Sequence, residues 1–179
     1  MFKACFLFGG KSFEHEVSVS SMRSVLSAYF SKKFIITIGG LDLENRLQFF
    51  SHGEFLERFQ AYGRFEKADR PANYEELKNF DVVFPLMHGD YVEDGSLQGL
   101  FTLFGVPFVG PNVLASSICM DKEVAKRLLV QAGLKVAEWI ALGPFEMLEI
   151  AKVTEKIGYP CFVKPASSGS SCGVSKVHS

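Results

Sequence analysis

The 179-residue sequence has almost no excess of charge, since 19 lysines and arginines are set against 20 aspartates and glutamates. Proteins that bind nucleic acid or an anionic membrane need a basic excess, so the sequence argues against both kinds of partner. Long apolar runs are absent as well, and no stretch reaches the roughly 18 residues of a membrane span. Lys3 interrupts the short apolar start, which therefore does not resemble a signal peptide. We expect a cytoplasmic protein.

Several motifs that would define a site are also missing. The four cysteines form no CxxC pair of the kind that zinc or redox chemistry needs, so we expect reduced, mostly buried thiols. No G-x-G-x-x-G follows the first apolar run, which argues against a dinucleotide oxidoreductase. In the serine-rich segment near the end of the sequence, a lysine precedes the glycines. This order excludes the usual P-loop geometry.

What is present is enough apolar material for a core. Hydrophobic residues make up 47% of the sequence and charged residues 22%, a composition that predicts folded structure. The length allows one domain, or one domain plus part of a second.

Strands and helices are predicted to alternate through the first 120 residues. The predicted strands are residues 3–8, 34–38, 81–86 and 107–110, the second of them closed by Gly39 and Gly40. The predicted helices cover Val19 to Tyr29, with Ser18 as a possible cap, then 97–104 and 114–120. Residues 41–73 have a weak pattern, with a strand at 46–50 and a short helix at 54–59, and are interpreted as a peripheral insertion. This alternation predicts a parallel sheet that holds ligands at the carboxyl ends of its strands.

A second unit is predicted from Asp121, which can cap a helix that stops at Gly133. A strand at 136–142 follows, then a helix from Gly143 to Gly158. Two further strands, at 161–164 and 173–177, flank a loop. We therefore divide the chain into domains 1–120 and 121–179.

The loop of this second unit is the first candidate for chemistry. It begins with Lys164, directly after a predicted buried strand, and is rich in serine and glycine as far as Gly173. Such a loop can approach a phosphate closely and offer it backbone N–H groups and hydroxyls. The composition fits an ordinary flexible hairpin loop equally well.

Two further candidates follow predicted strand ends in the first unit. Glu14 comes just after Gly9 and Gly10, where its carboxylate could bind a substrate ammonium. His88 follows the third strand and precedes several acidic residues. The plainer alternatives are a charged helix N-terminus stabilised by the helix dipole and a solvated acidic turn.

Four segments together resemble the D-alanine–D-alanine ligases in order and approximate spacing. They are FGGKSFEHEVS, LMHGDYVEDGSLQGLF, PFVGPNVLASSICMDK and CFVKPASSGSSCGVSKV. The resemblance implies an α/β fold, with a Rossmann-like parallel-sheet N-terminal domain followed by the beginning of an ATP-grasp central domain. It also implies an enzyme that uses ATP and Mg²⁺ to join two D-alanines for peptidoglycan synthesis through an acyl phosphate.

The resemblance assigns roles to residues of both units. Glu14 would orient the ammonium of the first D-alanine, Val17 would line that subsite, and His88 would lie near the same substrate. Lys122 and Lys164 would contact the ATP phosphates. Ser170 and Ser171 would belong to the mobile serine loop over the site. Ser170 would also join the hydrogen-bond network that includes Glu14.

Family members have about twice this length, and their metal-binding residues lie beyond the position of Ser179. The resemblance therefore implies that this chain holds no metal ligand, looks like a truncated fragment and is inactive alone, whereas the intact enzyme is expected to be a homodimer. Two alternatives stay open. One is a ligase that joins D-alanine to D-lactate or D-serine, and the other is a non-catalytic ligand-binding or interaction module.

Overall fold

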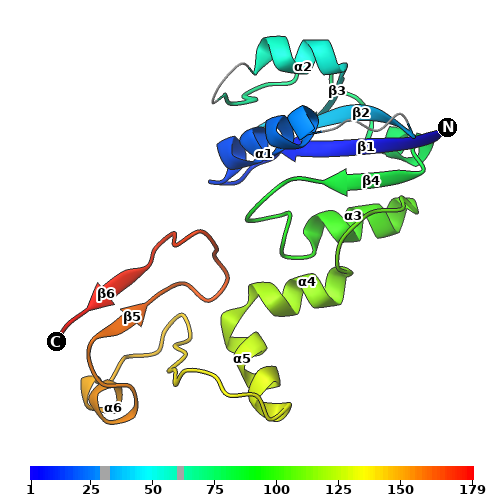
Figure 1. The fold of residues 1–179 in the computed structure, drawn as a ribbon. Coiled ribbons are helices and arrows are strands. Elements are labelled where there is room, and N and C mark those ends of the chain that lie inside the picture. Colours follow the sequence, from blue (N-terminus) through cyan, green and yellow to red (C-terminus); the bar gives the residue numbers. More distant parts are fainter. Residues whose placement is uncertain (29–32, 60–62) are drawn as a thin grey trace. The chain divides into compact units, whose positions relative to one another are not determined.

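The structure is a computed structural model that describes residues 1–28, 33–59 and 63–179. It divides into two compact units, Met1–Ser116 and Ser117–Ser179 (Figure 1). The predicted domain boundary after residue 120 stays a prediction. Within the described residues, no helix has the length and apolar character needed to cross a membrane.

The first unit is built on a four-stranded sheet in the order β3-β2-β1-β4. Its strands are β1 (Phe2–Gly9), β2 (Phe34–Leu41), β3 (Leu47–Phe50) and β4 (Val82–Pro85). β1 pairs in parallel with both β2 and β4, whereas β3 runs antiparallel to β2 at the edge. The predicted parallel sheet of an α/β fold is confirmed.

Helices cover both faces of this sheet. They are α1 (His15–Ala28), α2 (His52–Arg58), the 3-10 helix η1 (Tyr74–Asn79) and α3 (Ser96–Phe104). The next helix, α4 (Val113–Met120), contains the boundary between the units. Successive residues of β1 point to opposite faces, so Leu7 packs with Leu97 and Phe101 of α3, and Phe8 packs with residues of α1 and α2. The apolar runs therefore become strands buried on both sides.

The helix predicted over Val19 to Tyr29 is present as α1. Val19, Met22 and Leu26 form its buried face, as their helical spacing predicts. Tyr29 lies outside the described residues.

Residues 41–73 are not a peripheral insertion, and that interpretation is wrong. β3 and α2 occupy the predicted positions, but they contribute to the core. The rings of Phe55 and Phe59 lie 5.0 and 5.2 Å from the ring of Phe8, centroid to centroid, and Phe50 and Phe65 join the same cluster. The aromatic side chains of this charged segment turn inward.

Gly39 and Gly40 do not end β2, contrary to expectation, because the strand continues to Leu41. A Cβ atom on Gly39 would lie 2.5 Å from Leu7 Cδ2, and one on Gly40 would lie 2.7 Å from the ring of Phe8. The glycines serve close packing inside the strand rather than a turn.

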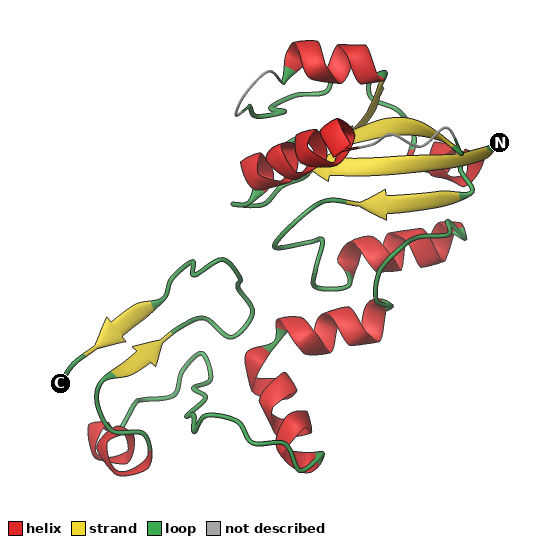
Figure 2. Cartoon of the chain, viewed as in Figure 1, coloured by secondary structure: helices red, strands yellow, loops and turns green. Residues whose placement is uncertain are grey.

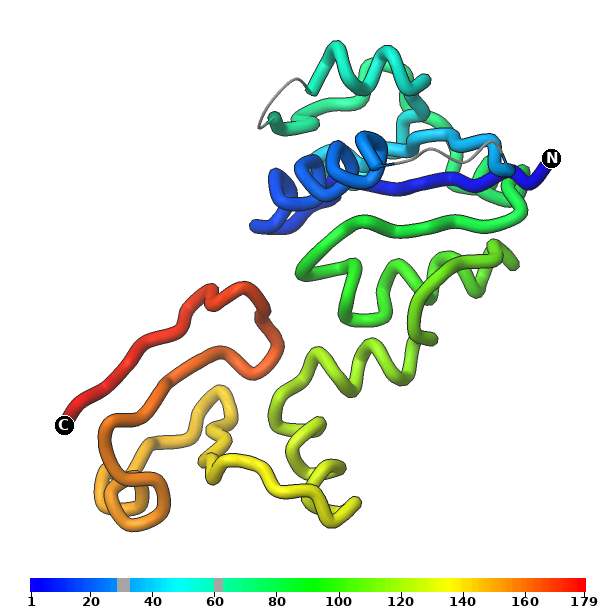
Figure 3. The backbone as a smooth tube through the Cα atoms, viewed as in Figure 1, coloured from blue at the N-terminus to red at the C-terminus, as the bar shows by residue number. Residues whose placement is uncertain are grey.

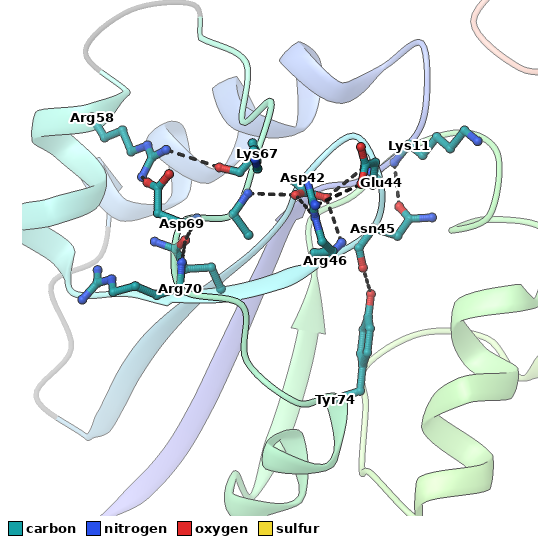
Figure 4. A network of polar contacts seen from close by, with 12 residues as sticks. Lys11, Asp42, Glu44, Asn45, Arg46, Arg58, Lys67, Asp69, Arg70 and Tyr74 are labelled. Atoms are coloured by element: carbon teal, nitrogen blue, oxygen red, sulfur yellow. Dashed lines mark hydrogen bonds and ion pairs between the residues drawn. The ribbon is translucent and has the colours of Figure 1, made fainter.

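A buried carboxylate fixes the end of β2 (Figure 4). The fully buried Asp42 accepts hydrogen bonds from the backbone N–H groups of Glu44, Arg46 and Ala68 at 2.8–2.9 Å, and from Arg46 Nε at 2.7 Å. Burial alone would raise the pKa of Asp42, but these hydrogen bonds outweigh it and lower the pKa below its usual value. The carboxylate ties residues 42–46 to the segment around Ala68.

The strand predicted at 107–110 is reduced to one bridge between Val83 and Phe108. The Val83 N–H donates to Pro107 O at 2.8 Å, and Val109 N–H donates to Val83 O at 2.9 Å. Pro107 has no N–H to give to a longer ladder.

The second unit contains α5 (Lys122–Gln131), α6 (Ile150–Lys156) and an antiparallel hairpin of β5 (Cys161–Val163) and β6 (Ser175–Val177) (Figure 2). Asp121 caps α5 as predicted, because its carboxylate accepts hydrogen bonds from the N–H groups of Glu123 and Val124. The predicted hairpin is also confirmed.

Two predictions for this unit are wrong. Residues 136–142 form no strand, and they pair with no other strand among the described residues. The helix expected from Gly143 begins only at Ile150. Glu146 accounts for the delay: its carboxylate accepts the Gly143 N–H at 2.9 Å and its own N–H donates to Gly143 O, which closes a turn there.

The four thiols are unpaired, as expected, but they are not mostly buried. Cys5 and Cys161 are buried, Cys172 is half-buried and Cys119 is exposed. Burial raises the pKa of Cys5 to about 12, so this thiol stays protonated at neutral pH.

Candidate functional site

A glycine turn at the end of β1 shapes the first part of the site. Gly9 and Gly10 have φ angles of +86° and +93°, in the left-handed region that favours glycine. Gly10 N–H donates to Leu41 O at 2.7 Å, which joins the ends of β1 and β2. A Cβ atom on Gly9 would lie 2.3 Å from Leu41 O, so no larger residue fits this turn.

Ser12 connects this turn to the end of β4. Its hydroxyl donates to His88 O at 2.7 Å and accepts the Glu14 N–H at 2.9 Å. A Cβ atom on Gly89 would lie 2.7 Å from Ser12 Oγ and 2.9 Å from Glu14 Oε2. The Glu14 carboxylate therefore lies directly against the backbone that follows His88, at the strand edge where the sequence placed both residues.

Acidic residues after His88 hold a turn. Gly89 N–H donates to Glu93 Oε2 at 2.7 Å, and Asp94 accepts the N–H groups of Tyr91 and Ser96 at 3.1 and 2.9 Å. These hydrogen bonds match the plainer alternative, an acidic turn.

Val17 and Glu16, which follow Glu14 closely, lie in the first turn of α1. Val17 is about half exposed, with 51% of its surface accessible. The Glu16 carboxylate is in an ion pair with Arg64 Nε at 2.9 Å. An exposed ion pair of this kind adds little stability, so Glu16 is a useful comparison for Glu14.

Two buried polar residues of α1 were not identified from the sequence. Ser18, considered there as a cap, accepts the Gly9 N–H at 2.8 Å and donates to Leu86 O at 2.7 Å, which joins the ends of β1 and β4. His15 Nδ1 donates to Gly10 O at 2.8 Å while its Nε2 accepts the Phe65 N–H. Their spacing from Val19 and Met22 places them on the buried helix face, and this is the signal that could have found them.

The second unit holds the predicted lysines and serines. Lys122 begins α5, and its ammonium donates to Ser168 O at 2.5 Å and to Ala166 O at 3.3 Å. Its backbone N–H also donates to Ala166 O, at 3.0 Å. Lys122 thus holds the serine-rich loop through carbonyl oxygens, and an anion would compete with these oxygens for its charge.

The loop itself links β5 to β6, and in Figure 3 it is the part of the tube where the colour changes from orange to red. Lys164 follows β5 directly and is exposed. Ser170 and Ser171 both have left-handed backbone conformations, with φ angles of 49° and 60°. A Cβ atom on Gly173 would lie 2.9 Å from Pro165 Cγ, so the two ends of the loop approach each other closely.

These residues suit a phosphate better than a metal. Two lysines and a strained serine loop offer the cationic and hydroxyl groups that bind phosphate oxygens. Among the described residues, no three His, Cys, Asp or Glu side chains are grouped so as to hold a metal ion. The described part of the chain therefore does not fit Mg²⁺.

Comparison with known proteins identifies the family of the chain. The family model described as the D-Ala–D-Ala ligase N-terminus matches residues 3–111, and the model of the ligase C-terminus matches residues 128–179. D-alanine–D-alanine ligase A of Chromobacterium violaceum is 41% identical, with 96% of this chain and 52% of the relative covered. The Escherichia coli K12 ligase A is 40% identical, with coverages of 97% and 53%. The chain spans about half the length of these relatives.

Solved structures agree as well. The D-alanine–D-alanine ligase from Coxiella burnetii matches with a TM-score of 0.81 and 29% identity, covering 99% of this chain and 55% of its own. VanG D-Ala:D-Ser ligase from Enterococcus faecalis matches with a TM-score of 0.76 and 31% identity, covering 99% and 56%. The fold is that of the ATP-grasp ligases. By its matches to the family models, the chain belongs to the D-alanine–D-alanine ligase family.

Proposed function

We propose that the chain is part of an ATP-dependent ligase that joins two D-alanines into D-alanyl-D-alanine for peptidoglycan synthesis in the cytoplasm. The observation that carries this proposal is the Glu14 carboxylate at the sheet edge, held beside His88 by Ser12 and by the absence of a side chain at Gly89. Family membership supports the substrate class.

In this proposal the first unit binds the first D-alanine. Glu14 pairs with its ammonium and orients it, Val17 lines the subsite, and His88 contacts the same substrate. A carboxylate that faces an ammonium forms a charge-assisted hydrogen bond with it. This interaction gives the site a preference for amino acids.

The second unit contributes to nucleotide binding in the same proposal. Lys122 and Lys164 neutralise phosphate oxygens, and Ser170 and Ser171 supply hydroxyls and backbone N–H groups from the loop. When bound, ATP supplies the phosphoryl group that activates the first carboxylate. The cations of this chain would stabilise the negative charge that develops in that transfer.

One observation favours a second candidate function. The match to VanG, described as a D-Ala:D-Ser ligase, supports a ligase that joins D-alanine to D-serine. Both candidates need the same first subsite, so comparing D-alanine with D-serine as the second substrate of the intact enzyme would separate them. We also propose that the intact enzyme is a homodimer.

The test measures D-alanine binding to the 179-residue chain by nuclear magnetic resonance. L-alanine is the comparison ligand. Glu14→Gln should weaken D-alanine binding roughly 10- to 100-fold, since a charge-assisted hydrogen bond is lost. Glu16→Gln removes the same charge two residues away and should change binding little. Equal, small effects of the two substitutions would remove Glu14 from the site.

Phosphate release from ATP in the presence of D-alanine tests the enzymatic part. The chain alone should release none above background, because the described residues supply only part of the charge stabilisation that phosphoryl transfer needs. Turnover by the purified chain would contradict this. D-alanine binding by an intact protein that also lacks turnover would favour a ligand-binding module.

A further inference from the structure

Three serine hydroxyls converge on the segment that ends β4. Ser12 Oγ donates to His88 O and Ser18 Oγ donates to Leu86 O, both at 2.7 Å. Ser21 Oγ lies 3.1 Å from His88 Nε2. The first two serines hold backbone atoms, whereas Ser21 contacts the imidazole ring itself.

We propose that Ser21 is a positioning residue for His88, and that its hydroxyl fixes the orientation and the tautomer of the imidazole ring beside Glu14. The inference rests on the proposed amino-acid subsite. Ser21 follows Val17 by four residues, so the two share one face of α1, and Glu14 directly precedes this helix. Ser12 holds the backbone of His88 and Ser21 holds its ring, which leaves the side chain little freedom.

The direction of the hydrogen bond sets the tautomer. Among the described residues, no other hydrogen bond reaches Ser21 Oγ or the ring of His88. In this proposal the Ser21 hydroxyl donates to Nε2, which leaves Nε2 unprotonated and the ring proton on Nδ1. Nδ1–H thereby becomes the donor that His88 can offer to an acceptor atom of the bound amino acid.

The ring nitrogens can be observed directly in the ¹⁵N-labelled 179-residue chain by long-range ¹H–¹⁵N correlation, with His88 assigned from the signals lost in His88→Gln. The wild-type chain should show Nδ1 protonated. Ser21→Ala should shift the population toward the Nε2–H form that a free imidazole prefers. Ser21→Thr retains a hydroxyl and should restore the wild-type signals.

Ser24→Ala is the matched control, since it removes an exposed hydroxyl of the same helix that donates to Ser20 O at 3.1 Å. It should leave the signals of His88 unchanged. The buried His15 ring reports in every variant whether α1 is still packed on the sheet. If Ser21→Ala leaves the His88 ring signals at their wild-type positions, the proposal is overturned.

D-alanine titration separates this inference from the proposed function. Ser21→Ala should weaken binding roughly 2- to 10-fold, the range expected when one neutral hydrogen bond is lost, and Ser24→Ala should not. If the tautomer depends on Ser21 but D-alanine perturbs neither Glu14 nor His88, the subsite fails and the positioning role stands. If D-alanine binds at Glu14 and His88 but Ser21→Ala leaves the His88 ring signals unchanged, the positioning role fails and the subsite stands.

Discussion

A Cβ atom on Gly89 would lie 2.9 Å from Oε2 of Glu14, so this glycine leaves free the space that the glutamate carboxylate needs. Gly89→Ala should therefore displace the carboxylate and weaken D-alanine binding by about tenfold or more, the loss of one charge-assisted hydrogen bond.

Gly105→Ala is the matched control for this substitution. Gly89 and Gly105 both have left-handed backbone angles, with φ of +80° and +65°, so alanine strains the backbone at each. Gly105 has open space around its Cβ position and ends α3. Comparable melting temperatures with reduced D-alanine binding only in Gly89→Ala would support the role of Glu14, and equal binding in both variants would contradict it.

Asp42→Asn should lower the free energy of unfolding by about 1.5 to 3 kcal/mol, because the buried carboxylate accepts a hydrogen bond from a guanidinium and three from backbone N–H groups. Urea unfolding measures the change. Asp69→Asn is the comparison: Asp69 is 63% exposed in its ion pair with Arg58, and its loss should cost less than about 1 kcal/mol. Similar losses in both variants would mean that the Asp42 network adds no stability beyond a surface pair.

Acid should remove the same stabilisation. The pKa of Asp42 is lowered in the folded chain relative to the unfolded value of about 3.9, so the folded state binds this proton less readily. The contribution is complete above the unfolded pKa and is lost as the pH falls through the folded pKa. The difference in unfolding free energy between wild type and Asp42→Asn should thus be constant from pH 7 to about pH 5 and shrink below pH 4. A difference that stays constant down to pH 2.5 would contradict this linkage.

Local sequence rules identified what depends on neighbours along the chain. The apolar runs gave the parallel strands, Asp121 was recognised as a cap, and strand ends pointed to Glu14 and His88. Such rules could not predict hydrogen-bond partners that are far apart in the sequence. The hydroxyl of Ser21 meets a ring 67 residues away, and the carboxylate of Asp42 meets an N–H 26 residues away.

Pairing explains the wrong predictions of secondary structure in the same terms. Residues 136–142 have the composition of a strand but no strand pairs with them among the described residues, and a strand is stabilised by its ladder. Gly39 and Gly40 look like a turn from their own composition. Their place inside β2 is set by Leu7 and Phe8 on the neighbouring strand, which a single-sequence rule does not see.

The close packing of Gly40 against Phe8 predicts the sign of a stability change. A Cβ atom there would lie 2.7 Å from Phe8 Cζ and 2.9 Å from Phe50 Cε2, so Gly40→Ala overpacks the core and should lower the free energy of unfolding by about 1 to 3 kcal/mol. Gly99 is inside α3 with open space at its Cβ position, and Gly99→Ala should raise the same free energy by about 0.5 to 1 kcal/mol. Urea unfolding of the two variants measures both signs. If Gly40 were a turn at the strand end with space around it, alanine there would cost little packing energy, and the absence of destabilisation would contradict the close approach of Phe8.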